Sequence, residues 1–315
     1  MRERIARLKS YPLTWIVGVT ILMAIVISMF SPHFLTVGNL TNLLKQVAIV
    51  AVLAGGQTLV ILSGGIDLSI GSVLALSAVT IGFLIENGFP PLLATAAGIA
   101  VGTLCGLING IVITRGRIPP FIATLGMMGI ARGLALVITK GVSYMVLVPF
   151  YDVIGNGSFL GLPVPIVIVI VVYAALYIVL RRTVFGRHVY AIGGNEQVSR
   201  LEGIRVDRQK ILIYTISGFL AAIAALIMVG RLASTPPHVA KGAELEAIAA
   251  VIIGGTSFTG GVGGVETTLI GALIMAMITN ALNILGVSSF WQQVFIGIVI
   301  IVAVWLDNLK GRNNR

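Results

Sequence analysis

The chain has 315 residues, of which 57% are hydrophobic and 10% are charged, and its mean hydropathy is +1.05. A soluble domain carries about 25% charged residues, so this composition excludes a water-soluble globular protein and indicates an integral membrane protein. The formal net charge of +10 would suggest a nucleic-acid partner in a soluble protein. In a membrane protein basic residues report topology instead, so we expect no nucleic acid.

The sequence begins with the basic stretch RERIARLK, which is followed by an apolar run from Pro12 to Phe30. A secretory signal peptide also has a basic start. This run is near the roughly 20 residues needed to cross a bilayer, and no small-residue cleavage site follows it. We therefore expect a retained first membrane helix.

Apolar runs separated by polar breaks predict an all-α, polytopic membrane protein of about ten transmembrane helices in one domain, 1–315. The eighth run is only about 15 residues long and could be tilted, broken or partly re-entrant. The expected spans are 12–31, 43–64, 67–86, 90–114, 120–139, 163–180, 209–230, 245–259, 265–285 and 290–307.

The basic residues predict the orientation of these spans. With a cytoplasmic N-terminus and alternating spans, sixteen of the 21 Lys and Arg residues lie inside, four lie outside, and Arg132 falls within a span. This bias follows the positive-inside rule and places both termini in the cytoplasm. The longest outer loops are then 140–162 and 231–244.

Catalytic and metal-binding patterns are missing from the sequence. It contains no G-x-x-x-x-G-K-[ST] loop for ATP and no G-x-S-x-G nucleophile motif. The three histidines, His33, His188 and His238, lack metal-ligand spacing. A single cysteine, Cys105, allows no intrachain disulfide. We therefore expect neither an enzyme nor a metal protein.

Glycines recur every four residues in the fourth span, at Gly98, Gly102, Gly106 and Gly110. This spacing places them on one helix face, where another backbone can approach closely. Asn109 lies beside the stripe and could donate a hydrogen bond to a neighbouring helix.

The stretch SGGIDLSIGS, residues 63–72, interrupts two apolar runs. Asp67 stands where the next helix would begin, so its carboxylate could simply cap that helix. Alternatively, a broken helix here could line the path of a solute, because irregular backbone at membrane depth is tolerated only inside protein or beside a water-filled cavity.

Arg132 lies about 18 Å into the fifth span by helix rise. A charge at this depth is costly unless it faces a partner or an aqueous cavity. The structural interpretation is a bond to buried backbone carbonyls, and the functional one is a place on the solute path. Asp67 could be its partner if residues 63–72 reach into the membrane.

Uncharged polar residues within or beside the spans suit a neutral, hydroxyl-rich solute, and equally suit hydrogen bonds between helices. The glycine-rich stretch IGGTSFTGGVGG, residues 253–264, is expected to be a tight cytoplasmic turn. The candidates for the translocation pathway are Gln57, Asp67, Ser69, Asn109, Thr124, Arg132, Asn280 and Asn283.

A polar, charge-rich stretch near 188–208 contrasts with the rest of the chain. Asn195 is a good N-cap, Glu196 suits a first helical turn, and Gly203 is a good C-terminal stop. These residues predict a helix of about two turns outside the membrane, too short to be stable alone. It needs a surface on which to dock; the alternative is a solvated loop near anionic lipid.

The stretch GRHVYAIGGNEQVSRLEGI resembles the cytoplasmic coupling segment of permease subunits in ribose-type bacterial ABC importers. The resemblance continues through GGIDLSIGS, IPPFIATLGMMGIARGLALV, ELEAIAAVIIGGTSFTGG and NALNILGVSSFWQQV, and so covers nearly the whole chain in order. The family usually has alanines where Val198 and Ser199 stand, a small residue at Glu202, and often Gly at Thr267.

This resemblance implies the larger, type II-like ABC importer permease fold in the bacterial cytoplasmic (inner) membrane. It also implies a second permease chain, an ATP-binding subunit with two nucleotide-binding domains that holds ATP and Mg, and an external solute-binding protein. This chain itself would bind no cofactor.

The implied solute is a pentose or hexose. A nucleoside, an autoinducer-type signal or a branched-chain amino acid is the alternative, and a self-sufficient secondary transporter is a further one.

Val198 and Leu201 would anchor the short helix in a groove of the ATP-binding subunit, with Glu196 and Arg200 setting its register. The implied coupling residues are Gly194, Asn195, Glu196, Val198, Arg200, Leu201 and Gly203.

Overall fold

The computed structural model describes residues 12–313, and this part of the chain is almost entirely helical. Helices occur in each of the ten segments predicted to be apolar spans. They are α2 (Pro12–Phe30), α3 (Val37–Leu62), α4 (Ile70–Glu86), α5 (Pro91–Thr114), α6 (Pro120–Thr139), α8 (Val164–Arg182), α11 (Val206–Leu232), α12 (Ala243–Ile253), α13 (Val265–Ile284) and α14 (Ser289–Asn313).

Three shorter helices and four two-residue strands complete the described chain. The helices are α7 (Pro149–Asn156), α9 (Val184–Gly194) and α10 (Glu196–Leu201). Strand β1 (Tyr144–Met145) pairs with β4 (Ser234–Thr235), and β2 (Ser158–Phe159) pairs with β3 (Leu162–Pro163), both antiparallel. The β1–β4 pair ties together the two loops that were expected to lie outside the membrane.

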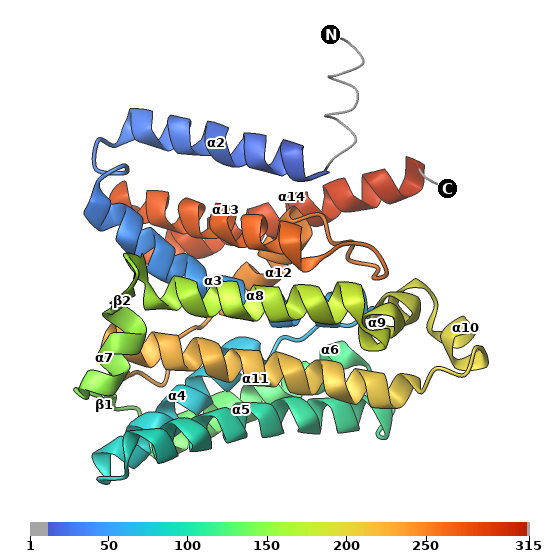
Figure 1. The fold of residues 1–315 in the computed structure, drawn as a ribbon, viewed down its shortest axis with the longest axis horizontal. Coiled ribbons are helices and arrows are strands. Elements are labelled where there is room, and N and C mark those ends of the chain that lie inside the picture. Colours follow the sequence, from blue (N-terminus) through green and yellow to red (C-terminus); the bar gives the residue numbers. More distant parts are fainter. Residues whose placement is uncertain (1–11, 314–315) are drawn as a thin grey trace.

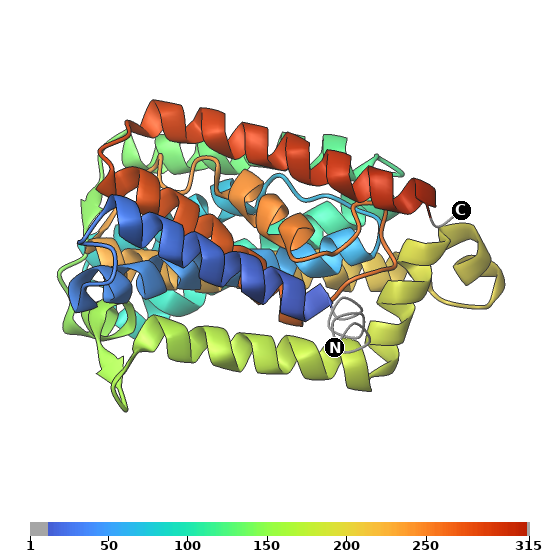
Figure 2. The same ribbon diagram turned by 90° about the horizontal axis from the view of Figure 1, so that it is seen from above.

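The long helices run roughly side by side along the longest axis of the molecule (Figure 1). α2 begins and α14 ends at the end of the bundle that carries α9 and α10, whereas α7 and the strands lie at the opposite end (Figures 1 and 2). Both ends of the described chain therefore lie at the same end of the bundle as the charge-rich segment.

In the part of the chain that the structure describes, six helices are long and apolar enough to cross a membrane: α3, α5, α6, α8, α11 and α13. The apolar parts of α2, α4 and α14 are shorter, and α12 has only 11 residues. The eighth predicted span, 245–259, was therefore too long, because Gly254 and Gly255 end the helix at residue 253 and Gly255 adopts a φ of +85°. A short α12 agrees with the broken-helix alternative for this segment.

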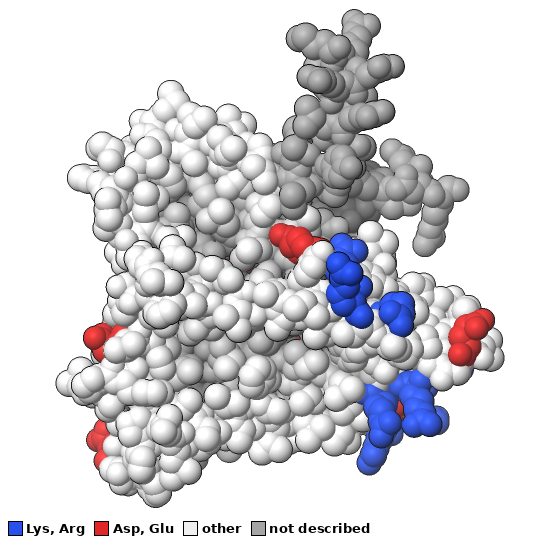
Figure 3. Space-filling view, in the orientation of Figure 1, with Lys and Arg blue, Asp and Glu red and all other residues white. Residues whose placement is uncertain are grey.

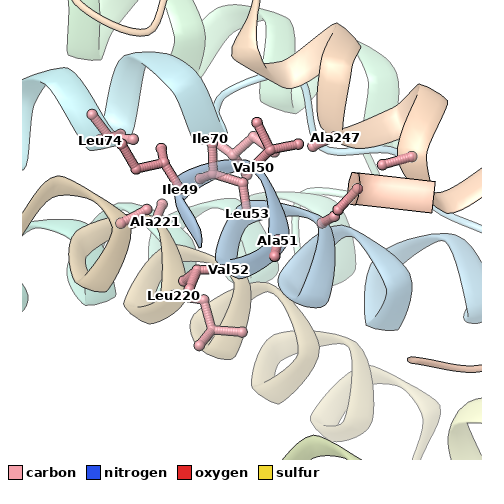
Figure 4. Packing of buried hydrophobic residues seen from close by; sticks show 14 of the residues in the cluster. Ile49, Val50, Ala51, Val52, Leu53, Ile70, Leu74, Leu220, Ala221 and Ala247 are labelled. Carbon is pink, nitrogen blue, oxygen red and sulfur yellow. The ribbon is translucent and has the colours of Figure 1, made fainter. Parts of the chain in front are cut away.

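Helix α3 lies at the centre of the bundle, and every residue from Val47 to Leu62 is buried. Figure 4 shows its residues Ile49, Val50 and Leu53 among side chains of α4, α11 and α12. α3 also packs against α8 and α13. Its sequence VAIVAVLAGGQTLVIL is apolar all round, as expected for a helix with no solvated face.

Neighbouring helices approach the glycine stripe on α5 closely, as the four-residue spacing predicted: Gly102, Gly106 and Gly110 contact α11, whereas Gly98 contacts Ile81 and Ser77 of α4. A Cβ on Gly106 would collide with the carbonyl of Tyr214, and one on Gly102 would meet the carbonyl of Gly218. Only glycine lets these two backbones approach so closely.

Replacing Gly106 by alanine is expected to destabilise the protein by roughly 1–3 kcal/mol, because the new methyl group forces α5 and α11 apart. Gly126→Ala is the matched control: Gly126 is also helical, but a Cβ there meets nothing within 4 Å. Thermal unfolding of the purified variants measures the difference. Equal melting temperatures for the two variants would show that the α5–α11 contact is not tight.

Candidate translocation and coupling sites

The loop 63–69, between α3 and α4, brings together five of the eight residues predicted for the pathway. The Gln57 side-chain amide, with its oxygen and nitrogen oriented to suit their partners, accepts from Asp67 N (3.3 Å) and donates to Asp67 O (3.2 Å). Thr124 Oγ1 on α6 donates to Ile66 O at 3.3 Å. Asn109 Nδ2 on α5 donates to Ser69 Oγ at 2.9 Å. The loop is therefore fastened by side chains from three different helices.

The Asp67 carboxylate is the acceptor at the centre of this cluster. Its Oδ1 accepts from Ser69 N (2.9 Å) and Ser69 Oγ (2.6 Å), and its Oδ2 accepts from Ser217 Oγ (3.1 Å) on α11. Asp67 is only 1% exposed. The N-cap of α4 is Ser69, so the expectation that Asp67 caps the helix directly is wrong; it closes the preceding turn instead.

These five residues are buried in the described conformation, with exposed fractions of at most 2%. Their hydrogen bonds are all made within the protein, which is the arrangement required of polar groups and irregular backbone inside a membrane. A role on the solute path requires this cluster to open, and that role stays a prediction. Sequence reasoning missed Ser217, because a lone serine in an apolar helix gives no local signal.

Arg132 on α6 bonds to buried backbone carbonyls, which is the structural interpretation given for it above. Its Nη1 donates to Pro237 O (2.6 Å) and Val239 O (2.9 Å), in the segment between β4 and α12. Asp67 is not among its hydrogen-bonded or ion-paired partners. The acidic group that stabilises the Arg132 charge through space is Glu244 on α12, which the sequence did not single out.

Glu244 packs against the beginning of α4. A Cβ on Gly71 would collide with Glu244 Oε2, and Glu244 Oε1 accepts from Gly242 N at 3.2 Å. A carboxylate near a helix N-terminus is stabilised by the helix dipole. Arg132 and Glu244 together therefore fix the segment 236–244 between α6 and α4.

Asn280 and Asn283 belong to a different part of the molecule from the 63–69 loop. Asn280 exchanges two side-chain hydrogen bonds with Asn39 near the start of α3, at 3.1 and 2.9 Å. Asn283 Oδ1 accepts from Gln292 Nε2 on α14 at 2.8 Å. In the described conformation these amides join helices, which is the structural alternative for them.

The charge-rich segment contains the short helix that was predicted. Asn195 Oδ1 accepts from Val198 N at 3.0 Å, which confirms the N-cap, and α10 runs from Glu196 to Leu201. Gly203, with a φ of +82°, follows the C-cap and ends the helix as expected. Helix α9, which ends at Gly194, was not predicted; it buries Val189 and Ile192 against the bundle.

An ion-pair network fastens α10 to the start of α11. Arg200 pairs with Glu196 (3.0 Å) and Asp207 (2.5 Å), and Lys210 pairs with Glu196 (2.5 Å). Partial burial raises the pKa of Glu196, but hydrogen bonds from Lys210 and Arg200 outweigh that effect and hold its pKa below the usual range. Glu196 and Arg200 thus orient α10 within this chain.

The apolar side chains of α10 point the other way. Leu201 is 87% exposed and Val198 is 50% exposed, although both are apolar. A cavity of about 540 Å³ lies beside the helix, between the α5–α6 turn and the side chains of Glu196, Arg200 and Lys210. Figure 3 shows charged side chains gathered at this end of the molecule.

The glycine-rich turn between α12 and α13 joins this end to the buried loop. Gly261 N donates to Leu62 O (2.9 Å), and Tyr190 Oη on α9 donates to Gly263 O (2.9 Å). A Cβ on Gly193 would collide with Leu62 O. Helix α9, the turn 254–264 and the last residue of α3 are therefore in direct contact.

Asp67→Leu is expected to destabilise the protein by about 2–4 kcal/mol, because it leaves the buried donors of Ser69 and Ser217 unpaired. Asp67→Asn should destabilise the protein less than Asp67→Leu: its oxygen can still accept from Ser69 and its nitrogen can donate to the Ser217 hydroxyl, although the proton of that hydroxyl then needs a new acceptor. Thermal unfolding and uptake are measured on both variants. A stable Asp67→Asn variant without uptake would show that the charge itself, and not the hydrogen bonding, is required.

Residues 39–304 match the family described as branched-chain amino acid transport system / permease component. The ribose import permease protein of Bacillus subtilis is 47% identical over 291 residues, covering 92% of this chain and 90% of that protein. The corresponding Escherichia coli K12 protein is 43% identical, covering 94% and 93%.

A more distant relative is the L-arabinose ABC transporter permease protein of Azospirillum brasilense, which is 36% identical over 95% of this chain and 88% of that protein. No solved structure matches. The family match covers most of the chain and the identities far exceed chance, so this chain belongs to the permease family of branched-chain amino acid transport systems.

Proposed function

We propose that this chain is the membrane-spanning permease subunit of an ATP-binding-cassette importer for a monosaccharide, with a ribose-like pentose as the first candidate. The names of the relatives, which import ribose, fructose and L-arabinose, support a sugar. An external solute-binding protein would deliver it. Two nucleotide-binding domains in a partner subunit would hydrolyse ATP, and a second permease chain would complete the membrane core.

The end of the bundle that carries α9 and α10 faces the cytoplasm in this proposal. Basic residues gather at this end, among them Arg115, Arg117, Arg182 and Arg208, and the positive-inside rule assigns such an end to the cytoplasm. The ten apolar helices would then cross or enter the bacterial cytoplasmic membrane, with α12 entering as a half-helix.

Helix α10 is the proposed docking element for the ATP-binding subunit, and the exposure of Leu201 is the observation that carries it. Leu201 lies on a helix of six residues and is 87% exposed, so it buries almost no apolar surface in the isolated chain. The Glu196–Arg200–Asp207 network holds the helix so that Leu201 points outward. A partner groove would bury it at the centre of an interface, where apolar anchors contribute most.

Motion of α10 would reach the buried loop through a short series of contacts. α10 follows α9 directly, α9 touches the turn 254–264 through Tyr190 and Gly193, and that turn donates a hydrogen bond to Leu62. Leu62 is the last residue before the Asp67 loop. A displacement of α9 would thus act on the place where α3 is broken.

Leu201→Asp is expected to abolish ATP-driven uptake and to reduce co-purification of the ATP-binding subunit, because a charge buried in an interface without a partner costs several kcal/mol. Leu160→Asp is the matched control: Leu160 is 88% exposed at the opposite end of the bundle. Affinity purification of the tagged permease, followed by quantification of the bound ATP-binding subunit, measures the effect.

Both variants should fold, since neither side chain packs in the core. Normal co-purification of the ATP-binding subunit with Leu201→Asp would contradict the role of α10. Equal loss with both variants would point to a general defect in assembly instead.

In this proposal the permease and the ATP-hydrolysing site belong to different subunits. The chain alone should hydrolyse no ATP, because its sequence lacks a phosphate-binding loop. Reconstituted with its ATP-binding subunit and solute-binding protein in vesicles, it should take up radiolabelled ribose in an ATP-dependent way, in excess over leucine. Hydrolysis by the chain alone, or preferential uptake of leucine, would refute the proposal.

A further inference from the structure

A groove of about 530 Å³ runs between α8 and α11, and its lining is entirely apolar. Ile168, Ala175 and Val179 form one wall, and Phe219 and Ile223 form the other. The groove opens away from the core, because Val171 on its rim is 62% exposed and Phe219 is 41% exposed.

The central helix α3 creates this groove by holding its two walls apart. Tyr173 Oη on α8 donates to Ala51 O of α3 at 2.9 Å, and Gly55 of α3 lies under Leu176. The next residue, Gly56, lies under Ser217 of α11. α8 and α11 thus both pack on α3, while α7 packs against both at one end of the groove and α9 packs against both at the other.

The dimensions of the groove suit a hydrocarbon chain. The lining residues of α8 extend from Val167 to Val179, which is about 18 Å by helix rise. One leaflet of a bilayer core is about 15 Å thick. The face over α8 and α11 shows no charged side chain between its two ends (Figure 3), so the groove would lie wholly among acyl chains.

Basic side chains stand at one end of the groove. On α8 the lining residues Ile168, Ala175 and Val179 follow helical spacing, and Arg182 is the next residue on that stripe. On α11 the stripe of Ile223, Phe219 and Ile216 continues through Leu212 to Arg208. Arg182 and Arg208 are exposed and form no ion pair with the side chains that the structure describes (residues 16–305, without Ser289), whereas the neighbouring Arg181 is paired with Glu266.

We propose that this groove binds one acyl chain of an anionic phospholipid, with the phosphate-bearing headgroup held by Arg182 and Arg208. Basic residues near a membrane surface attract anionic lipid. A second copy of this chain fits the groove less well. A twofold interface centred here would set groove against groove and leave a cavity instead of a packed contact.

Native mass spectrometry of the purified full chain tests the proposal, in detergent micelles containing equal amounts of phosphatidylglycerol and phosphatidylcholine. The wild type should retain phosphatidylglycerol preferentially. Ala175→Trp, which fills the groove, should lower the retained lipid several-fold. Ala174→Trp is the matched control, because Ala174 is also exposed on α8 but does not line the groove. Should Ala175→Trp fail to fold, the smaller Ala175→Phe takes its place.

The headgroup is tested separately with Arg182→Gln, which should reduce the preference for phosphatidylglycerol over phosphatidylcholine several-fold. Arg115→Gln removes an exposed charge from the same end of the bundle on α5 and should leave the preference unchanged. Equal lipid retention by Ala175→Trp and Ala174→Trp would overturn the proposal. An unchanged preference in Arg182→Gln would overturn the assignment of the headgroup. Loss of permease dimers in Ala175→Trp alone, without loss of lipid, would assign the groove to a second copy.

Discussion

The complete burial of α3 is the constraint on which the rest of the structure depends. From Val47 to Leu62 every residue of this helix is buried within the protein, so each polar group on it needs a partner there. Thr58 Oγ1 bonds to Ala54 O (2.7 Å) and Thr268 Oγ1 (3.0 Å), and Gln57 bonds to the backbone of Asp67. The two adjacent glycines of α3 let neighbouring helices approach closely: Gly55 contacts Leu176 of α8, and Gly56 contacts Ser217 of α11.

The end of α3 is where the backbone leaves the regular helix among buried residues. A helix that stops inside a membrane exposes backbone groups that only protein can satisfy there. Side chains from α3 and α6 bond to the backbone of the 63–69 loop, and side chains from α5 and α11 bond to its Ser69 and Asp67 side chains. The loop is thus held both by these hydrogen bonds and by packing of Ile66 and Leu68 against the hydrophobic core. It also lies in direct contact with the turn that touches α9.

Helix α10 differs from an ordinary surface helix in which of its side chains are exposed. Its charged side chains are engaged in ion pairs with α11, whereas its Leu201 is 87% exposed. A solvated helix normally shows the opposite arrangement, with apolar side chains inward and charges outward. Ion pairs at a surface contribute little stability, so their value here is orientation: they hold an otherwise unstable two-turn helix in one position.

Local physics decided what the sequence could predict. The helix over 120–139, the N-cap at Asn195, the stop at Gly203 and the close-packing glycines of α5 were all predicted correctly, because apolar periodicity, capping and side-chain size act within a few residues.

The tertiary structure decided the rest. Arg132 bonds to carbonyls more than 100 residues away, Ser217 meets Asp67 across 150 residues, and α9 is held against the bundle by Val189 and Ile192. The sequence alone could place polar residues inside the membrane, but their partners depend on how α3, α5, α6 and α11 pack together, and that packing is a property of the whole chain.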